Sequence, residues 1–231
     1  IIKTRFQKSI QIHMSDPTSN SIPKNGLIID ACGNQRWYKN NKLHRDDGPA
    51  IVLVNGDLHW YQNGEQHRND GPAVTHTDGS QFWYQHGKSH RIDGPAVVCA
   101  NGNQYWFRNG VYHRDGGPAI VHANGCQEWW QNGKRHRDGG SAIVYTDDGI
   151  DNTQEWYQHG RLHRDGGPAI VYVDGYQEWR QNGLRHRDGG PAVVHANGRQ
   201  EWWQNDMYHR IDGPAIVHAD GSEEWYQNGI R

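Results

Sequence analysis

A histidine–arginine pair followed by an aspartate recurs along the chain, and its residue types could do chemistry. A histidine near a carboxylate can act as a general base, and the same groups can ligate a metal ion. The triplets are His44-Arg45-Asp47, His67-Arg68-Asp70, His90-Arg91-Asp93, His113-Arg114-Asp115, His136-Arg137-Asp138, His163-Arg164-Asp165, His186-Arg187-Asp188 and His209-Arg210-Asp212.

The equivalence of these triplets argues against both chemistries. Successive copies are expected roughly 10 Å apart, whereas a zinc ion needs its ligands about 2 Å from one point. We therefore expect a structural role, in which the aspartate caps a glycine turn and the arginine pairs with a carboxylate of its own or the next unit. We predict no catalytic residue, no metal site and no cofactor, and a protein that is not an enzyme.

Glutamates before tryptophan form a second candidate set. Glycoside hydrolysis needs two carboxyl groups in unlike environments. Equivalent units do not provide these, so cross-strand pairing with Lys or Arg is expected. The set comprises Gln127-Glu128, Gln154-Glu155, Gln177-Glu178 and Gln200-Glu201.

The position after the Ile-Val pair is variable in an otherwise uniform pattern. It marks either a recognition strip or a site that tolerates any residue in contact with solvent. Its residues are Leu53, His76, Cys99, His122, Tyr145, Tyr172, His195 and His218.

The stretch 117–139, GPAIVHANGCQEWWQNGKRHRDG, is the unit that positions these residues. It returns every 23 residues, except for one unit of 27 at 140–166 that places four extra residues in a loop at 146–153. Such a period is typical of a repeat array whose units stack on their neighbours. Residues 25–231 are predicted to hold nine tandem repeats, the last truncated, after an N-terminal cap or arm at 1–24.

Each unit carries β signals throughout. Residues 119–123 are apolar and β-branched, Asn124-Gly125 is a strong hairpin signal, and 126–131 read as the return strand. A second Asn-Gly and a Gly-Gly reversal follow, and Gly and Pro recur too often for helices. We predict an all-β fold, an elongated antiparallel array of β-hairpin repeats.

The faces of this array are predicted from the hairpin turn. A two-residue turn at Asn55-Gly56 would pair Ile51 with Trp60 and place both on one face, with Tyr61 on the other. The first row is predicted to be the buried structural ladder: Trp37, Trp60, Trp83, Trp106, Trp129, Trp156, Trp179, Trp202 and Trp225. The opposite row, interrupted by Arg180, is the possible binding face: Tyr38, Tyr61, Tyr84, Phe107, Trp130, Tyr157, Trp203 and Tyr226.

Composition and charge exclude several classes. The formal net charge of −2 supplies no basic field for nucleic acid or anionic lipid. The 11 Trp and 11 Tyr at fixed spacing argue against disorder, although only 34% of the residues are hydrophobic. Cys32, Cys99 and Cys126 occupy different places in the repeat and indicate neither a disulfide ladder nor a metal site. No apolar run reaches about 18 residues, so no membrane span is predicted.

The heptapeptide 130–136, Trp-Gln-Asn-Gly-Lys-Arg-His, resembles the MORN repeat at the same period. That family's unit has a Trp or Phe, then Asn-Gly-Lys, then His-Gly. Here Arg follows His, and the family's Tyr-x-Gly before the aromatic is missing, so the chain resembles a divergent variant. The resemblance implies a twisted single-layer β-ribbon with a scaffold or membrane-adjacent linker role. The units are also similar to repeats in giant-virus and microbial proteins.

The predicted function is a non-enzymatic scaffold or self-assembling surface module that binds a protein partner or an identical chain. Two alternatives stay open: a carbohydrate-binding rod that uses the exposed aromatic row, and a virion or fibre component. No nucleic-acid partner is expected, because base stacking on a single strand also needs a basic groove. The location is open between the cytoplasm and a virion or extracellular fibre.

Overall fold

The fold is that of a computed structural model, which describes residues 12–14, 24–145 and 153–231. These residues form strands and turns and contain no helix, which confirms the all-β prediction. They divide into two compact units, Ile1–Gly102 with Phe107–Gly110 and Asn103–Trp106 with Val111–Arg231. In the described part of the chain, no helix has the length and apolar character needed to cross a membrane.

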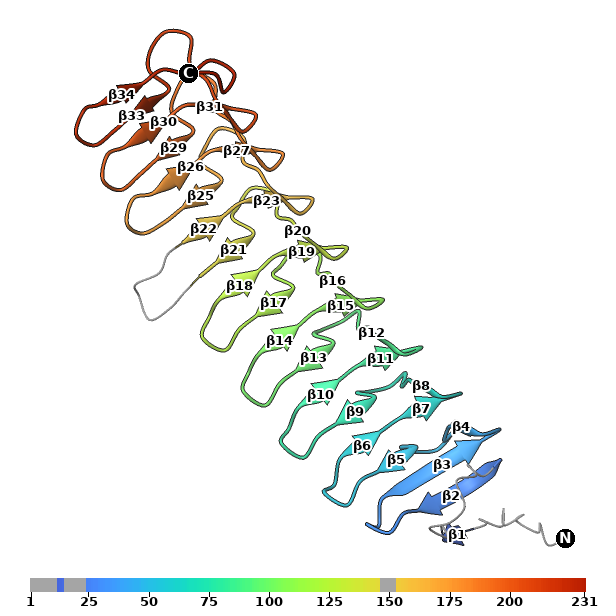
Figure 1. The fold of residues 1–231 in the computed structure, drawn as a ribbon. Coiled ribbons are helices and arrows are strands. Elements are labelled where there is room, and N and C mark those ends of the chain that lie inside the picture. Colours follow the sequence, from blue (N-terminus) through green and yellow to red (C-terminus); the bar gives the residue numbers. More distant parts are fainter. Residues whose placement is uncertain (1–11, 15–23, 146–152) are drawn as a thin grey trace, which may run out of the picture. The chain divides into compact units, whose positions relative to one another are not determined.

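The first unit consists of main-sheet strands and shorter flanking strands (Figure 1). The main-sheet strands are β1 (Ile12–Met14), β2 (Asn25–Ile29), β3 (Gln35–Lys39), β5 (Ile51–Val52), β6 (Leu58–His59), β9 (Val74–Thr75), β10 (Gln81–Phe82) and β13 (Val97–Val98). β4 (Lys42–Leu43) pairs with β3 and so also belongs to the main sheet. The flanking strands are β7 (Tyr61–Gln62), β8 (Glu65–Gln66), β11 (Tyr84–Gln85), β12 (Lys88–Ser89) and β15 (Phe107–Arg108).

The second unit repeats this plan. Its main-sheet strands are β14 (Gln104–Tyr105), β17 (Ile120–Val121), β18 (Gln127–Glu128), β21 (Ile143–Val144), β22 (Gln154–Glu155), β25 (Ile170–Val171), β26 (Gln177–Glu178), β29 (Val193–Val194), β30 (Gln200–Glu201), β33 (Ile216–Val217) and β34 (Glu223–Glu224). Its flanking strands are β16 (Val111–Tyr112), β19 (Trp130–Gln131), β20 (Lys134–Arg135), β23 (Tyr157–Gln158), β24 (Arg161–Leu162), β27 (Arg180–Gln181), β28 (Leu184–Arg185), β31 (Trp203–Gln204) and β32 (Met207–Tyr208).

The main-sheet strands of each unit pair in chain order. Within one repeat β5 and β6 form an antiparallel hairpin, and β6 then pairs with β9 of the next repeat. In the second unit the same alternation runs from β17 to β34. Each repeat therefore adds one hairpin, or two strands, to the sheet, as the sequence predicts.

The predicted N-terminal cap is described at β1, which pairs in parallel with β2, and at Lys24. The rest of that segment, 1–11 and 15–23, lies outside the described residues. So do residues 146–152 of the predicted longer loop. On either side of that loop the register is kept, because Val144 still pairs with Gln154.

The two hairpins of each repeat end in different turns. At Asn63-Gly64 both φ angles are positive, 52° and 89°, which makes the two-residue type I′ turn that joins β7 to β8. The main-sheet hairpin instead has a three-residue loop at 54–56. Leu53 N donates to Asp57 O at 3.0 Å, and only Gly56 in the loop has positive φ, 93°. This arrangement is typical of a turn closed by a glycine bulge.

The three-residue loop overturns the predicted register. Ile51 pairs with His59 rather than with Trp60, and Val52 pairs with Leu58. Because side chains alternate along a strand, this one-residue shift moves Trp60 to the face opposite Ile51. The predicted face assignment is wrong for this reason.

Small and branched aliphatic residues form the buried core. An alanine at the start of each main-sheet repeat is fully buried, at Ala50, Ala73, Ala96, Ala119, Ala142, Ala169, Ala192 and Ala215. The next residue is buried at Val74, Ile120, Ile143, Ile170, Val193 and Ile216. The predicted core ladder is half-buried from Trp37 to Trp202 and exposed at Trp225, and none of its residues belongs to the fully buried core. The prediction of a tryptophan core is therefore wrong, and the indoles have another role.

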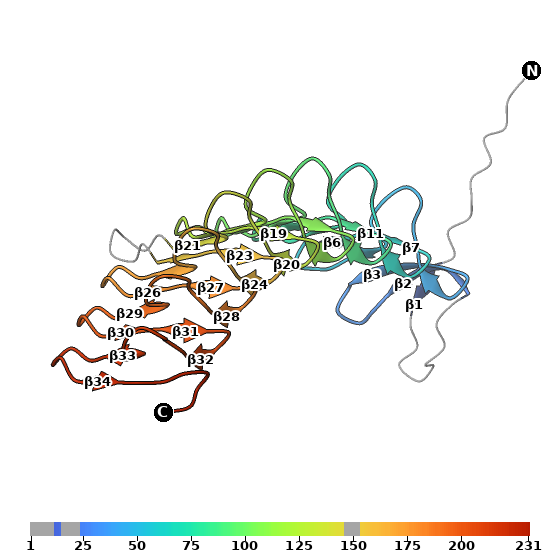
Figure 2. The same ribbon diagram turned by 90° about the horizontal axis from the view of Figure 1, so that it is seen from above.

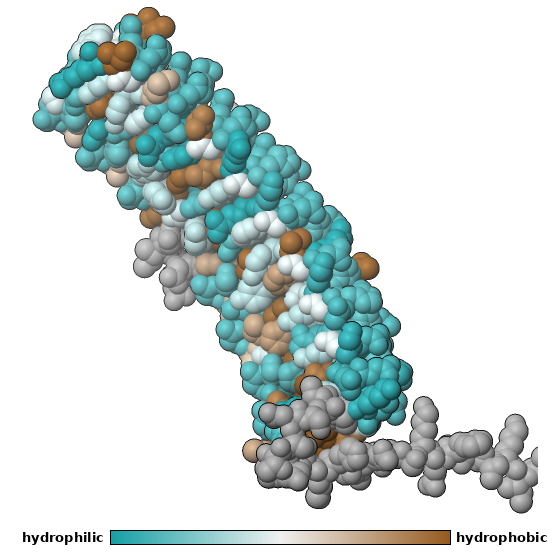
Figure 3. Space-filling model, turned by 45° about the vertical axis from the view of Figure 1, so that its right-hand side comes forward, coloured by the Kyte–Doolittle hydropathy of each residue, from teal (hydrophilic) through white to brown (hydrophobic). Residues whose placement is uncertain are grey.

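The two sides of the sheet differ. We call the side of Ile120, Glu128 and Trp130 the open face, and the side of Val121, Gln127 and Trp129 the loop face. In the first unit the segments from β8 to β9 and from β12 to β13 arch over one side of the sheet (Figure 2). In the view of Figure 3, pale and brown side chains of the repeats gather between hydrophilic ones.

Val193→Ala and Val194→Ala make the same chemical change on the two faces. Val193 is 2% exposed, whereas Val194 is half-buried on the loop face. We expect Val193→Ala to lower the free energy of unfolding by about 2 kcal/mol and Val194→Ala by about half as much. Urea denaturation of the full chain measures both, and equal losses would contradict the observed register.

Candidate functional site

A row of glutamates runs along the open face of the second unit. Glu128 pairs across the sheet with Ile120 on one side and Ile143 on the other. This alternation of glutamate with Ile or Val continues to Glu224, so that apolar side chains flank each carboxylate stem. The row comprises Glu128, Glu155, Glu178, Glu201 and Glu224. The first unit has other residues at this position: Arg36, His59 and Phe82.

Glu178 is the most buried glutamate of the row, at 3% exposed. Its carboxylate accepts hydrogen bonds from the Tyr176 hydroxyl at 2.7 Å and from Nε of Arg180 and of Arg185, both at 2.8 Å. Burial opposes ionisation, but the bonds from Tyr176 and Arg185 and the charge of both arginines outweigh it and lower the pKa of Glu178. Arg180, which interrupts the aromatic row in the sequence, is thus a partner of this carboxylate.

Tryptophans of the aromatic row bond to the same carboxylates. Trp130 Nε1 donates to Glu128 Oε2 at 3.1 Å, and Trp203 Nε1 donates to Glu201 Oε2 at 3.0 Å. Arg135 Nε also donates to Glu128, at 3.2 Å. The predicted pairing of these glutamates with arginine is confirmed here. These bonds hold the indoles in place, and each ring also contacts an arginine, with Arg135 Cζ 5.2 Å from the Trp130 centroid and Arg185 Cζ 5.0 Å from that of Trp203.

Glu201 gathers several donors. It is 6% exposed, and its carboxylate lies 3.0 Å from His195 Nε2, 2.8 Å from Arg199 Nη2 and 3.4 Å from the Tyr208 hydroxyl. His195 belongs to the variable position after Ile-Val, and His218 makes the same contact to the next glutamate at 2.9 Å. In this part of the chain the variable position therefore supplies partners to the glutamate row.

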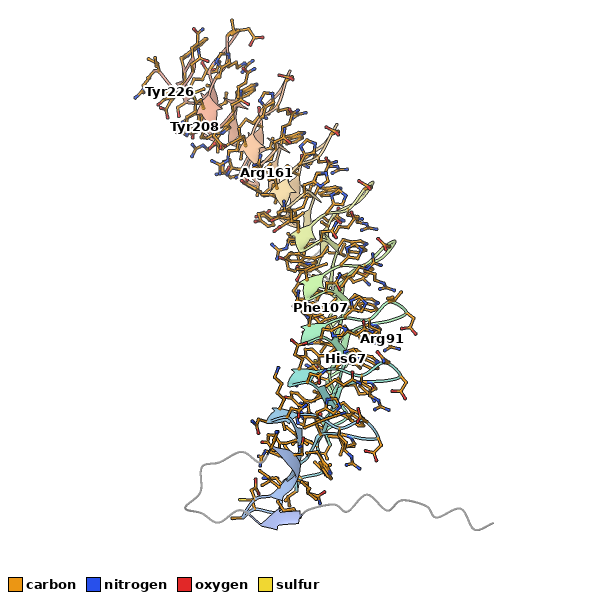
Figure 4. The ribbon with its side chains drawn as sticks, turned by 90° about the vertical axis from the view of Figure 1, so that its right-hand side faces the viewer. His67, Arg91, Phe107, Arg161, Tyr208 and Tyr226 are labelled. Carbon is orange, nitrogen blue, oxygen red and sulfur yellow. The ribbon has the colours of Figure 1, made fainter. Side chains whose placement is uncertain are left out.

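Aromatic side chains connect neighbouring repeats on the open face. Trp203 and Tyr208 are cross-strand partners with ring centroids 3.7 Å apart, and Tyr208 lies 5.3 Å from Tyr226 of the next repeat (Figure 4). The predicted binding-face residues are all half-buried: Tyr38, Tyr61, Tyr84, Phe107, Trp130, Tyr157, Trp203 and Tyr226. Sequence reasoning missed Tyr208. The signal was available, because a two-residue turn places the residue five positions after Trp203 directly opposite it.

The open face can accept hydrogen bonds and can stack against a ligand. Hydrogen bonds from His218 and Tyr226 lower the pKa of Glu224, as those from other donors lower that of Glu178. Both carboxylates are therefore ionised acceptors at neutral pH. Within the described ranges, no group of three or more His, Cys, Asp or Glu side chains is arranged to hold a metal ion.

Each connecting loop on the loop face is built around an arginine. Cζ of Arg137 lies 3.7 Å from the centroid of the Trp129 ring, and its Nη1 donates to the Ser141 carbonyl oxygen at 3.0 Å. A Cβ added at Gly140 would lie 2.8 Å from the same guanidinium, so a larger residue there would displace the arginine from its place on the indole. The same stack, with distances of 3.7–4.2 Å, is formed by Arg45, Arg68, Arg91, Arg114, Arg137, Arg164, Arg187 and Arg210.

Each histidine of the repeated triplet bridges two repeats. His113 Nδ1 accepts the backbone N–H of Asn132 at 3.2 Å, and its Nε2 lies 3.1 Å from Asp115 Oδ1. A backbone N–H can only donate, so Nδ1 carries no proton and Nε2–H donates to the carboxylate. The Nδ1 bridge also forms at His44, His67, His90, His136, His163 and His209. At these seven histidines Nδ1 is thereby used within the fold, and at His186 it lies 3.2 Å from the Asn205 side-chain oxygen.

Comparison with known proteins assigns no family to the chain. No family model matches it, and no curated protein matches it. The resemblance to the MORN repeat therefore stays a prediction, based on the period and on the spacing of Trp, Asn-Gly and His.

His113→Phe keeps a ring at this position but removes both ring nitrogens. The N–H of Asn132 would lose its partner in a part-buried place, so we expect the free energy of unfolding to fall by about 1–3 kcal/mol. Asp115→Asn is the control, because it keeps an acceptor for Nε2–H, and its expected effect is below about 0.5 kcal/mol. Urea denaturation measures both. A His113→Phe variant as stable as the parent would show that the bridge is dispensable.

The raised pKa of Tyr157 predicts that the free energy of unfolding falls at alkaline pH. Burial and the charge of Glu155, which accepts the Tyr157 hydroxyl proton at 3.0 Å, raise the pKa of Tyr157 to about 12. An unfolded tyrosine titrates near about 10. The stabilisation is therefore complete below about pH 10 and is lost as the pH rises towards 12. We expect Tyr157→Phe to decline less steeply than the parent in denaturation series across this range, and parallel declines would refute the assignment.

Proposed function

We propose that the protein is a non-enzymatic interaction module whose open face binds a partner protein or a second copy of the chain. The observation that carries the proposal is the repetition of bonded carboxylates from Glu128 to Glu224, to each of which the residue two positions later donates. That donor is aromatic in four of these repeats and is Arg180 in the fifth. Tyrosine, tryptophan and arginine are the side chains that contribute most of the binding energy at protein interfaces.

Hydrogen bonds already fix the aromatic side chains of the open face in the absence of a partner, and this also supports the proposed role. The indoles of Trp130 and Trp203 and the hydroxyls of Tyr157 and Tyr226 each donate to a glutamate of their own repeat. Side chains that are already fixed lose little conformational entropy when a partner docks on them. A repeated, ordered surface suits a scaffold that binds along several units.

Trp203→Ser and Gln177→Ser compare the open face with the loop face. The Trp203 ring contacts Tyr208, whereas Gln177 lies on the loop face beside Val171. We expect Trp203→Ser to weaken association at least about tenfold, or about 1.4 kcal/mol, and Gln177→Ser to leave it unchanged. Sedimentation velocity over a concentration series measures self-association, and affinity capture on the immobilised chain detects other proteins. A parent chain that stays monomeric and retains no protein would contradict the proposal.

A carbohydrate ligand is the alternative that one contact favours. The rings of Trp203 and Tyr208 lie together beside Glu201, and both donate to its carboxylate. A pyranose offers an apolar C–H face for stacking and hydroxyl groups for such acceptors. Retention of the parent on a glycan array, lost with Trp203→Ser, would select this alternative. The virion or fibre role stays a prediction from the sequence.

A further inference from the structure

The arginine loops on the loop face are of two kinds. In the first kind an aspartate follows two positions after the arginine, and its Oδ1 accepts from arginine Nε at 3.0–3.2 Å. These pairs are Arg45–Asp47, Arg68–Asp70, Arg91–Asp93 and Arg210–Asp212. An internal carboxylate thus neutralises each of these stacked guanidinium groups, as the sequence predicts for this arginine.

The second kind of loop lacks that carboxylate and occupies four consecutive repeats of the second unit. Its arginines are Arg114, Arg137, Arg164 and Arg187, and a glycine follows two positions later. These glycines have φ of 71–74°, and a Cβ added to any of them would meet nothing within 4 Å. The space beside each loop is therefore open. Among the described residues, none of these four arginines makes an ion pair.

The aspartate of the second kind of loop lies one position earlier and contacts the histidine instead. Asp138 Oδ1 is 3.4 Å from His136 Nε2, and Asp165 Oδ1 is 3.3 Å from His163 Nε2. The carboxylate of these loops is therefore paired with the histidine and not with the arginine. The two kinds of loop have nearly the same sequence. They differ in that the aspartate follows the arginine by two positions in the first kind and by one position in the second.

The guanidinium groups of the second kind of loop lie closer to their indoles than those of the first kind. Their Cζ atoms lie 3.7–3.9 Å from the indole centroids, against 4.1–4.2 Å in the first kind of loop. Nη1 donates to a loop carbonyl at 3.0–3.1 Å. Burial lowers the pKa of Arg114, Arg137 and Arg187, with no carboxylate to offset it. Within the described residues, no protein acceptor bonds to Nε of any of these four groups.

We propose that Arg114, Arg137, Arg164 and Arg187 bind the carboxylates of an acidic peptide segment, one carboxylate per repeat. The first kind of loop shows how such a carboxylate would bind, because the Asp93 carboxylate accepts a hydrogen bond from Nε of Arg91. Charge-assisted bonds of this kind are stronger than neutral ones. This surface lies on the loop face, apart from the open face of the proposed function, so either proposal can fail without the other.

The spacing of the repeats favours a peptide as the ligand. Each repeat adds two strands, which places equivalent arginines about 9.6 Å apart. A polyproline II segment has three residues per turn and rises about 3.1 Å per residue, so every third side chain points the same way about 9.3 Å further on. A denser polyanion is disfavoured, because single-stranded nucleic acid carries a charge about every 3.4 Å. Its additional charges would meet exposed aspartates of the loops: Asp115, Asp138, Asp165 and Asp188.

The first experiment measures binding of fluorescent (Glu-Pro-Pro)5 to the full chain by anisotropy at low ionic strength. The matched control is (Gln-Pro-Pro)5, which has the same conformation without the charges. We expect the glutamate peptide to bind at least about tenfold more tightly. Equal affinities would overturn the proposal. Displacement by a single-stranded oligonucleotide at lower concentration than by unlabelled glutamate peptide would also overturn it, in favour of a general polyanion site.

The second experiment moves one aspartate without changing the net charge. Asp138→Asn with Gly139→Asp converts this loop to the Asn-Asp sequence of residues 69–70, where Asn69 contacts His67 and Asp70 pairs with Arg68. Neither Asn69 nor Asp70 has positive φ, so the backbone at residue 139 must change with the sequence. We expect the affinity for the glutamate peptide to fall about fivefold. A thermal unfolding midpoint close to that of the parent would show that the fold is retained.

The reverse change provides a gain of binding as the control. Ile211→Asp with Asp212→Gly removes the internal partner of Arg210, the next arginine in the row. We expect this variant to bind the five-glutamate peptide about fivefold more tightly than the parent. An affinity unchanged in either folded variant would overturn the proposal.

Discussion

An arginine held between an indole and a glycine is the contact on which each loop between two successive repeats depends. In the loop of Arg137 the guanidinium lies 3.7 Å from the Trp129 centroid, and Gly140 leaves room for it by having no side chain. The stack fixes the path by which the chain returns from a short hairpin to the main sheet. It also explains why Trp, Arg and Gly recur together at constant spacing, although the indoles are not the buried core.

Contacts between repeats use backbone donors that the two-residue strands leave unpaired. On the short-hairpin side a neutral imidazole accepts the turn N–H, as His113 accepts that of Asn132. On the main-hairpin side of the first unit a side-chain oxygen does so, as Asp57 accepts the N–H of Thr77 at 2.8 Å. Polar side chains thus complete the bonding that longer strands would supply themselves. Stability in such an array depends on interactions between nearest neighbours.

The hairpins and their order could be predicted from the sequence, whereas their register could not. An Asn-Gly pair ends both hairpins of a repeat, but Asn63 adopts positive φ and its counterpart Asn55 does not. An Asn-Gly dipeptide therefore does not by itself predict whether the loop has two residues or three. The bond from Arg185 to Glu178, seven residues apart, becomes foreseeable only once the intervening two-residue turn is known. The arginine stack depends on a loop path that tertiary contacts set, beyond the reach of local sequence patterns.

Two strands per repeat is an even number, and this parity has an evolutionary consequence. The unit with four additional residues obeys the same rule, since Ile143 still faces Glu155 as Ile120 faces Glu128. Duplication or deletion of whole units would therefore leave every side chain on its original side of the sheet. Descendants of such a gene can therefore differ in the number of repeats while each repeat keeps the same side chains on the same face.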